Sequence, residues 1–566
     1  SVGGIGWAVR DRAAQRAGRT ARTAAQVELI LTNVDRAMKE QNWDEALVVA
    51  KRAEAVLAGG EADEGTRGKV TEAVKDLEFV ERLELIRMQS ATVVDNTLDF
   101  AGAVRKYELA FREYGIDVGS LPTESSVMAL QGHEAIHCPL AAALDDWAEC
   151  RGNSIGMDDP HRRALIALAR RLDPDPTRDR LRASLGQKVT VELQAELRQL
   201  AESIDVRVQP PATLIALAHT LFRTQLADVG ERLLRQAQSA HPGDFWINFY
   251  LGLSLSQKKN EDEAVRYYST ALGIRPTSSA AHNNLGSALE SLGKLDEAIT
   301  CYRQAVALQP NDTLALNNLG DALREQGKLF EAIAHFSKVI ELDPKNAAAH
   351  SNLGNAMFDQ QKLDQALACY QTAIECDPKN AKAHYNLGIA LGKQNRLDEA
   401  IASYRNAIAS DPKFALAHNN LGNALRKQGK LDDAVVSFGN AIKLDPNYAP
   451  AYSNLGIALV DQEKLDEAID NFRKAIRLDP KFVPAHDYLG RMLSRRTKYD
   501  DAIASFRKTI ELDPTRAAAH FEAALTLNIL GRPDEAIAHY KKVIELDPNN
   551  AKAHVILGTI LRNSKQ

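Results

Sequence analysis

The chain has 566 residues and a net charge of −5; 45% of its residues are hydrophobic and 26% are charged. This composition is typical of a soluble folded protein and excludes a disordered one, and the pI of about 6.3 argues against a general nucleic-acid-binding protein. The five cysteines form no C-x-x-C pair and no dense framework, so we expect reduced thiols that are structurally incidental.

Residues 1–24 form a basic segment behind a short apolar start. Small and apolar side chains run as far as Trp7, Ala8 and Val9, and five arginines then follow with only one acidic residue among them: Arg10, Arg12, Arg16, Arg19 and Arg22. A Trp beside an arginine cluster is typical of the end of a transmembrane helix at the membrane interface. We therefore expect a juxtamembrane segment, tethered through a span upstream of Ser1 on a side of the membrane that the sequence does not indicate. An ordinary basic amphipathic helix is the alternative. The chain itself has no run of 18 apolar residues that would span a membrane.

Residues 25–208 have an irregular helical pattern. Helices are predicted over MKEQNWDEALVVAKRAEAVL (38–57) and TLDFAGAVRKYELAFREYGID (97–117), whose apolar residues recur with a helical period. Clusters of Gly, Pro, Asp and Ser predict breaks between helices, at 59–60, 121–126, 151–160 and 173–176. This segment is predicted to be a separate helical domain that precedes a more regular region.

The stretch GHEAIHCPL (132–140) contains the string H-E-x-x-H at 133–137. In zinc peptidases this string places two histidines one helical turn apart beside a general-base glutamate, so a zinc metallopeptidase is the alternative function of another class. Pro139 fits best in the first turn of a following helix, which puts His137 at a helix end rather than within a helix. Glu149 is the one conceivable third ligand. We therefore expect no metal, no cofactor and no catalytic residue here, and assign the histidines to a surface.

Ten prolines spaced by 34 residues organise the C-terminal two thirds of the chain: Pro242, Pro276, Pro310, Pro344, Pro378, Pro412, Pro446, Pro480, Pro514 and Pro548. One unit is ALAHNNLGNALRKQGKLDDAVVSFGNAIKLDPNY (415–448), and positions are numbered from its first residue. A fixed period of this length predicts stacked helical hairpins, because a single hairpin cannot bury its apolar faces alone. Ten units fit the sequence: 211–244, 245–278, 279–312, 313–346, 347–380, 381–414, 415–448, 449–482, 483–516 and 517–550.

Each special residue of a unit has a predicted role. Small residues, Gly422 at position 8 and Ala434 at position 20, let the two helices of a hairpin approach closely. Phe438 at position 24 is expected to fill the gap between neighbouring units, and Asp432 to cap the second helix. Gly429 is expected to end the first helix and Pro446 the second.

Residues 551–566 supply only the first helix of an eleventh unit. Its apolar residues have no following helix to cover them: Ile556, Leu557, Ile560 and Leu561. Terminal repeats normally present a polar outer face. We therefore expect either a truncated repeat or an apolar face at 551–562 that takes part in self-association or meets a partner.

The pattern over 211–566 resembles the tetratricopeptide repeat family. That resemblance implies an all-α, right-handed superhelix, an α-solenoid in which the first helix of each unit, helix A, lines the concave wall. Residues 38–57 and 97–117 resemble the second half of a tetratricopeptide hairpin, so 25–208 is predicted to be a degenerate domain of the same kind. The first unit departs from the pattern, with Ala218 and Gly230 where Gly and Ala are usual.

A further resemblance covers the N-terminal part. SVGGIGWAVRDRAAQR (1–16), WDEALVVAKRAEAVLAGGEAD (43–63) and LAAALDDWAECR (140–151) are similar to the segment after the membrane span in planctomycete-type bacterial serine/threonine receptor kinases with tetratricopeptide tails. The resemblance implies a kinase domain upstream. No kinase signature occurs in this chain, since it lacks the Gly-rich loop, H-R-D-L-x-x-x-N and D-F-G. We therefore predict a sensory or scaffolding tail without catalysis of its own.

Position 6 carries an asparagine in six successive units: Asn284, Asn318, Asn352, Asn386, Asn420 and Asn454. An amide side chain offers a donor and an acceptor and can pair with the main chain of an extended peptide. The row resembles the inner asparagine ladder of the O-linked N-acetylglucosamine transferase superhelix, which implies a peptide-binding groove. The alternative is that each amide bonds the backbone of the neighbouring unit and serves packing. Positions 5 and 9 lack the basic residues of a carboxylate clamp.

Position 4 carries histidines at a spacing of one unit: His282, His350, His384, His418, His486, His520 and His554. Shared metal ligation is excluded by that separation, and packing is the predicted role. The sequence as a whole predicts a non-catalytic, protein- or peptide-binding scaffold with no nucleic-acid partner. Membrane attachment is predicted only through a segment upstream.

Overall fold

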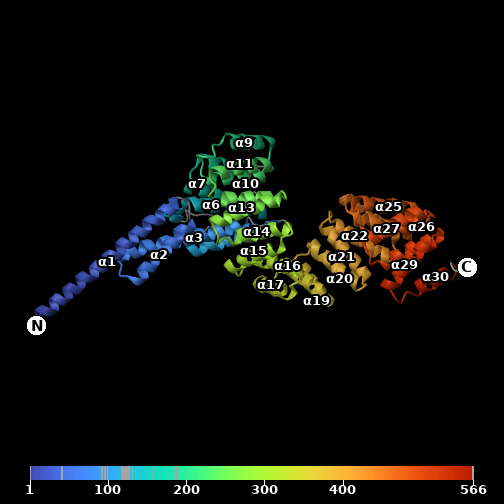
Figure 1. Cartoon of the computed structure of the whole chain (residues 1–566). Coiled ribbons are helices and arrows are strands. Elements are labelled where there is room, and N and C mark those ends of the chain that lie inside the picture. The colour runs from blue at the N-terminus through green and yellow to red at the C-terminus, as the bar shows by residue number, and fades with distance from the viewer. Residues whose placement is uncertain are drawn as a thin grey trace. The chain divides into compact units, whose positions relative to one another are not determined.

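The structure is a computed structural model that describes residues 2–39, 43–90, 93–94, 97–98, 100–116, 128–130, 132–156, 158–184 and 189–563. The chain folds as two compact units, Ser1–Asn318 and Leu319–Gln566. Helices joined by short turns make up nearly all of both units (Figure 1). The predicted all-α fold is therefore confirmed, with one small addition. Two strands, β1 (Val93–Val94) and β2 (Thr97–Leu98), form an antiparallel pair.

The first unit begins with irregular helices that precede the repeats. Their bounds are α1 (Val2–Lys39), α2 (Trp43–Gly59), α3 (Glu64–Ser90), α4 (Phe100–Tyr114), the 3-10 helix η1 (Glu134–Ile136), α6 (His137–Ser154), α7 (Pro160–Leu172), α8 (Pro176–Ser184) and α9 (Val191–Ser203). Helices α1 to α4, η1, α6 and α7 share one core, in which Phe79 packs edge-to-face on Phe111 and Phe111 lies against Trp147. The aromatic side chains therefore join α3, α4 and α6.

Helix α1 passes through the predicted limit of the basic segment at residue 24 without a break. The side chains of residues 1–13, including Trp7, Arg10 and Arg12, lie outside the part of the chain that the structure describes. Among the described residues, no helix combines the length and the apolar character that crossing a membrane requires.

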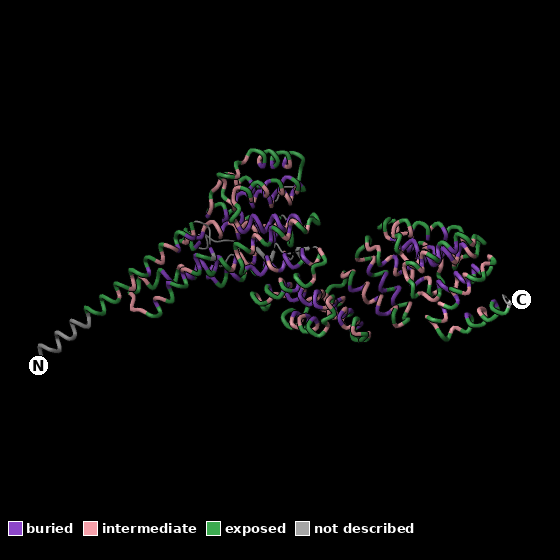
Figure 2. The backbone as a smooth tube through the Cα atoms, viewed as in Figure 1, coloured by how far each residue is buried: buried purple, intermediate pink, exposed green. Residues whose placement is uncertain are grey.

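Each predicted repeat unit forms one helical hairpin. The first helices, termed helix A, are α10 (Pro211–Arg223), α12 (Phe245–Gln257), α14 (Ser279–Ser291), α16 (Thr313–Glu325), α18 (Ala347–Asp359), α20 (Ala381–Lys393), α22 (Ala415–Lys427), α24 (Ala449–Asp461), α26 (Val483–Arg495) and α28 (Ala517–Ile529). The second helices, termed helix B, are α11 (Ala227–Ala240), α13 (Glu261–Ile274), α15 (Leu295–Leu308), α17 (Leu329–Leu342), α19 (Leu363–Cys376), α21 (Leu397–Ser410), α23 (Leu431–Leu444), α25 (Leu465–Leu478), α27 (Tyr499–Leu512) and α29 (Pro533–Leu546). Buried residues run along the sides where helices face each other (Figure 2).

Glycine at position 8 is required by an aromatic ring at position 24 of the same unit. A Cβ on Gly422 would lie 2.7 Å from Cε1 of Phe438, and the same clash recurs at the equivalent glycine of most units. Phe438 therefore packs within its own hairpin. The first unit reverses the arrangement, because its glycine, Gly230, lies on helix B against Phe222 of helix A. This unit thus departs from the sequence pattern by having its glycine on helix B instead of helix A.

The predicted cap of helix B is wrong. Lys430 occupies the N-cap of α23 without a side-chain hydrogen bond, and Asp432 lies inside the helix. Its carboxylate accepts a hydrogen bond from Gln462 Nε2 of the next unit, at 2.8 Å. The same pair, Gln at position 14 and Asp at position 18 of the preceding unit, recurs at Gln394–Asp364 and Gln428–Asp398. This position therefore links neighbouring units rather than capping a helix.

The turn between helix A and helix B is left-handed at position 15 in all ten units. Gly293, Gly327, Gly429 and Gly531 hold it in four units, with φ between 71° and 83°. Six other units place a residue with a Cβ there, at φ between 58° and 63°: Gln225, Lys259, Gln361, Asn395, Glu463 and Thr497. A β-branched residue is the least suited to this conformation, so the backbone at Thr497 is strained.

Thr497→Gly is expected to stabilise the chain by about 1 kcal/mol, because the left-handed conformation costs a residue with a Cβ about 1–2 kcal/mol and glycine loses more freedom on folding. The midpoint of chemical denaturation should rise. The reverse exchange at the equivalent position, Gly429→Thr, should lower it by a similar amount. Equal midpoints for both variants would show that the turn is not strained.

Candidate peptide-binding face

The helices A form one continuous layer within Leu319–Gln566. Each helix A contacts the helix A of the next unit as well as its own helix B, from α18 through α20, α22, α24 and α26 to α28. Position 6 lies on this layer. Within Leu319–Gln566 the asparagines at this position are half-exposed, namely Asn352, Asn386, Asn420 and Asn454. Within Ser1–Asn318, Asn318 is half-exposed, while Asn284 is buried at 7% exposure.

In four of these asparagines the amide nitrogen bonds a side chain of the preceding unit. Asn386 Nδ2 donates to Asn355 Oδ1 at 2.9 Å, and Asn454 Nδ2 donates to Asn419 Oδ1 at 2.9 Å. Asn420 Nδ2 donates to the hydroxyl of Tyr385 at 3.0 Å. Within Ser1–Asn318, Asn318 Nδ2 donates to Asn283 Oδ1 at 2.9 Å. The donor end of the amide thus links neighbouring units, through side chains rather than through the backbone.

The acceptor end of the amide is in a different situation. Within residues 319–563, no protein donor engages Oδ1 of Asn386 or of Asn454, whereas Oδ1 of Asn420 accepts a bond from Asn419 Nδ2 at 3.3 Å. A carbonyl oxygen at a half-exposed position can accept a main-chain N–H of a ligand. The amides therefore can serve packing with one end and binding with the other.

A cavity of 90 Å³ opens beside Asn386 on the same layer. Its walls combine the apolar side chains of Phe358 and Ile389 with the ring of Tyr370, whose hydroxyl donates to Asn355 Oδ1 at 2.8 Å. Burial raises the pKa of the Tyr370 hydroxyl above its usual value, so this group remains a neutral donor. The cavity can take an uncharged side chain next to the asparagine.

An ion pair borders this cavity. Arg324 Nη1 lies 2.8 Å from Asp359 Oδ2, and the equivalent residues three units later, Arg426 and Asp461, form the same pair at 2.9 Å. The sequence pattern did not predict these cross-unit contacts. A signal was present, since an arginine recurs at position 12 and an aspartate at position 13 of the following unit. Asn355 at position 9 and Asn419 at position 5 are likewise partners that the absence of positive charge at these positions did not indicate.

The H-E-x-x-H string does not form a helical metal site. His133 lies before η1, its Nδ1 is 3.0 Å from Asp76 Oδ2, and its ring also contacts the hydroxyl of Tyr114. His137 opens α6 and bonds the carbonyl oxygen of Leu130 through Nε2 at 3.1 Å. The two rings thus have separate partners. The prediction that His137 lies at a helix end is confirmed, while the surface assignment of His133 is wrong, because Asp76 and Tyr114 half-bury it.

The histidines at position 4 bond the turn that precedes their helix A. The ring Nε2 donates to the carbonyl oxygen of the proline six residues earlier, at 3.0–3.3 Å, in His282, His350, His384, His486, His520 and His554. Because a carbonyl only accepts, Nε2 carries the proton. The predicted structural role of these histidines fits this geometry.

The last helix, α30 (Ala551–Asn563), packs on α29 more closely than predicted. Ile560 is buried at 7% exposure, and Ile556 and Leu557 are partly buried against Tyr540 and its neighbours. The expectation that all four apolar residues lack cover is therefore wrong. Val555, at 68% exposure, and Leu561, at 39%, remain at the surface.

Comparison with known families points to repeats over the same part of the chain. The family profile described as the cilia and flagella-associated protein 70 C-terminal domain matches residues 250–487. The profile described as the tetratricopeptide repeat matches residues 215–279 and 489–551. Neither profile describes an enzyme. No curated protein matched the chain.

Three solved structures are similar in part. YrrB, described as a TPR protein with an unusual peptide-binding site, is 25% identical, with 32% of this chain and 95% of its own covered and a TM-score of 0.28. MamA is 29% identical, with 29% and 97% covered and a TM-score of 0.28. PilF from Pseudomonas aeruginosa is 22% identical, with 38% and 98% covered and a TM-score of 0.35.

The family profiles and the hairpins agree in position. The matched ranges coincide with α10–α29, whose period, position 8 glycines and left-handed turns are those of stacked helical repeats. Arrays of this architecture offer extended surfaces to partner proteins. The chain is thus an all-α solenoid of stacked helical hairpins that matches the tetratricopeptide repeat over residues 215–279 and 489–551, and its architecture is that of a protein-interaction scaffold.

Proposed function

We propose that the repeats bind an extended segment of a partner protein along the helix A layer, without catalysis. The proposed binding residues are the half-exposed asparagines of Leu319–Gln566, namely Asn352, Asn386, Asn420 and Asn454. The observation that carries the proposal is the orientation of the amides. The nitrogens of Asn386 and Asn454 bond the preceding unit, and their oxygens have no protein donor within residues 319–563.

The orientation defines how the segment is held. The amide oxygens accept main-chain N–H groups of the bound segment, and the cavity at Phe358 and Ile389 receives one of its uncharged side chains. Because these contacts are made to the main chain, bound segments of many different sequences can be held in the same way. Each such hydrogen bond contributes about 0.5–1.5 kcal/mol net, so affinity accumulates along the row.

The parent protein is proposed to be a bacterial membrane serine/threonine kinase of which this chain is the sensory or scaffolding tail. Support comes from the sequence resemblance of residues 1–16, 43–63 and 140–151. The gene sequence upstream of Ser1 tests this point. A membrane span preceded by kinase motifs is the expected finding, and an upstream region without them would refute the assignment.

Replacing Asn352, Asn386 and Asn454 together by alanine is expected to weaken peptide binding roughly tenfold or more, the loss that follows when three main-chain hydrogen bonds disappear. The probe is a peptide selected on the chain from a random library and measured by calorimetry. A second peptide with the same sequence carries N-methyl groups on alternate backbone nitrogens, which removes donors but keeps the side chains.

The chain offers a matched control for this variant. Gln394, Gln428 and Gln462 also carry amides that bridge neighbouring units, but they bond Asp364, Asp398 and Asp432. Their joint replacement by alanine should leave affinity unchanged. N-methylation should weaken binding to the native chain and to this control, but not further to the asparagine variant. Unchanged affinity of the asparagine variant, or an equal loss in both triple variants, would restrict the asparagines to packing.

A further inference from the structure

Tyr385 lies at position 5 of its unit, directly before the proposed binding residue Asn386 on α20. Its side chain is half-exposed. The ring packs against Phe414, with ring centroids 4.9 Å apart, and against the buried ring of Tyr404, at 6.0 Å. These contacts within Leu319–Gln566 hold the ring from two sides, so they restrain the position of its hydroxyl group.

The hydroxyl of Tyr385 ends a chain of hydrogen bonds that runs through three successive units. Asn454 Nδ2 donates to Asn419 Oδ1 at 2.9 Å, and Asn419 Nδ2 donates to Asn420 Oδ1 at 3.3 Å. Asn420 Nδ2 in turn donates to the hydroxyl oxygen of Tyr385 at 3.0 Å. Each bond is donated toward Tyr385, so the chain has an open acceptor at Asn454 Oδ1 and ends on a group that itself carries a proton.

The hydroxyl proton of Tyr385 is available to a ligand. A phenol that accepts one hydrogen bond still has a proton to donate. Within residues 319–563 no protein atom accepts that proton. Burial raises the pKa of the Tyr385 hydroxyl above its usual value, so the group stays protonated near neutral pH. The bond that it accepts from Asn420 polarises the O–H group and makes it a stronger donor.

The helix A layer thus offers two kinds of polar group to a bound segment. The amide oxygens of Asn386 and Asn454 accept hydrogen bonds, whereas the hydroxyl of Tyr385 donates one. An extended main chain exposes N–H and C=O groups in alternation along each edge. A row of acceptors alone would satisfy the N–H groups and leave the carbonyl groups between them without a donor. Tyr385 supplies a donor within this row of acceptors.

We propose that the hydroxyl of Tyr385 donates a hydrogen bond to a main-chain carbonyl of the bound segment, beside the N–H group that Asn386 accepts. This inference rests on the proposed binding of an extended segment along the helix A layer, and it defines the partner further. The segment must have both N–H and C=O groups of its main chain unpaired, which a helical segment does not have. Asn420 then acts by orienting the hydroxyl of Tyr385, because its own amide oxygen is already bonded to Asn419.

Two sets of modified peptides separate the carbonyl contact from the N–H contacts. Both are derived from the peptide selected on the chain from a random library. In the first set a thioamide replaces one backbone amide at a time, which weakens the acceptor and keeps the N–H group. In the second set one backbone nitrogen at a time is N-methylated, which removes the donor. Calorimetry with the full chain should find a thioamide position that weakens binding roughly threefold to tenfold.

Tyr385→Phe keeps the ring and removes the hydroxyl. It should weaken the unmodified peptide roughly threefold to tenfold, the loss of one hydrogen bond. The sensitive thioamide position should lose its effect in this variant, while the N-methyl groups should still weaken binding. Tyr452→Phe is the matched control, because the hydroxyl of Tyr452 donates to the carbonyl oxygen of Pro446 at 3.3 Å, in the turn before α24. This exchange should leave the affinity for every peptide unchanged.

Two results would overturn the role of Tyr385 and leave the proposed function intact. These are equal binding of the unmodified peptide to Tyr385→Phe and to the native chain, and a thioamide effect that persists in Tyr385→Phe. Either would restrict the hydroxyl to linking α20 and α22. Native-chain binding that no N-methyl group weakens would instead overturn the proposed main-chain recognition, and this inference with it. Because the thioamide and unmodified peptides are compared on the same variant, a general loosening of the face would not imitate the expected result.

Discussion

Gly422→Leu is expected to lower the free energy of unfolding by roughly 3 kcal/mol, near the upper end of the overpacking effects seen in protein cores. A Cβ at this position would already lie 2.7 Å from the ring of Phe438, and that ring is fully buried. Relief requires α22 and α23 to separate. Because each repeat is stabilised mainly by its neighbours, weakening one unit in the middle of the array should also split the unfolding transition in chemical denaturation.

The same repeat supplies the control. Gly439 lies in α23, and nothing stands within 4 Å of a Cβ built there. Gly439→Ala should therefore stabilise the chain by about 0.5–1 kcal/mol, the gain expected from replacing a glycine inside a helix. The two glycines are seventeen positions apart in one hairpin, so opposite signs would separate the effect of packing from that of helix propensity. A Gly422→Leu midpoint equal to that of the native chain would show that the two helices do not depend on this contact.

The repeats could be predicted from the sequence because every unit repeats the same information. Gly422 and Phe438 recur at fixed spacing in successive units, so the pattern reports the hairpin even where one unit departs from it. The exchange at Ala218 and Gly230 illustrates this, since the glycine of the first unit lies on helix B and faces Phe222 of helix A. Helix ends at Gly429 and before Pro446 followed from backbone chemistry alone.

The candidate site was predicted only in part. The position of the asparagines on helix A followed from the period, but their bonding partners did not. Asn386 bonds Asn355, thirty-one residues earlier, and Asp432 bonds Gln462, thirty residues later. A residue such as Asp432 near a helix start suggests a cap when it is judged locally. Its carboxylate instead meets an amide of the next unit, because stacking brings the two side chains within hydrogen-bond distance.

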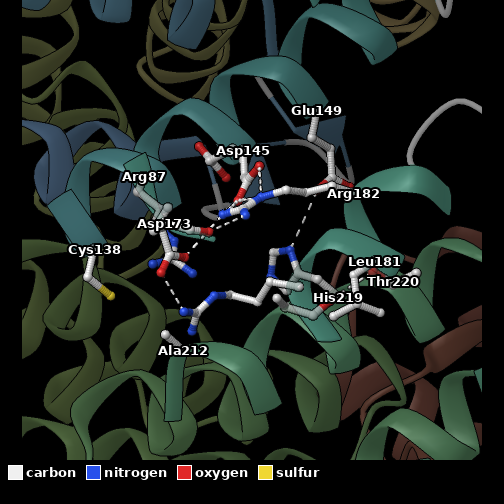
Figure 3. A pocket seen from close by; sticks show the side chains of 14 residues that line it. Arg87, Cys138, Asp145, Glu149, Asp173, Leu181, Arg182, Ala212, His219 and Thr220 are labelled. Carbon is white, nitrogen blue, oxygen red and sulfur yellow. Dashed lines mark hydrogen bonds and ion pairs between the residues drawn. The ribbon is translucent and has the colours of Figure 1, made fainter. Parts of the chain in front are cut away.

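The N-terminal region shows the limit of local patterns. The partner of His133 is Asp76, fifty-seven residues away on α3, and nothing around the H-E-x-x-H string indicates it. The pocket that Figure 3 shows, lined by Arg87, Asp145, Arg182 and His219 among others, combines residues from α3, α6, α8 and α10 that share no spacing. Without a repeat to relate them, such contacts depend on how irregular helices pack. The buried charges around that cavity therefore lead to a prediction that only the structure supports.

Arg182→Met is expected to lower the free energy of unfolding by about 3–5 kcal/mol near neutral pH, the effect of removing one partner from a buried ion pair. Arg182 is 2% exposed. Its Nε donates to both oxygens of Asp145 at 3.0 Å, and its Nη groups donate to Asp173 and Asp179. Methionine fills a similar volume but leaves these carboxylates without the cation between them.

The loss should depend on pH in a defined direction. Burial raises the pKa of Asp145 to about 6, from an ordinary value of 3.8, while Arg182 opposes that rise. Without Arg182 the folded-state pKa of Asp145 rises further above its unfolded value. A carboxyl group whose pKa is higher in the folded than in the unfolded state makes its full contribution to stability below the unfolded-state pKa. That contribution is lost as pH rises through the folded-state pKa. Denaturation curves should therefore show a smaller loss in the free energy of unfolding at about pH 5 than at about pH 8.

Arg235→Met is the control, because Arg235 bonds Glu231 and Glu263 near the surface, where such pairs contribute at most about 1 kcal/mol. The pKa values of both glutamates are lowered, so they stay ionised across this range and the small deficit of the control should be constant. A deficit for Arg182→Met that is equally constant would show that Asp145 does not titrate with folding.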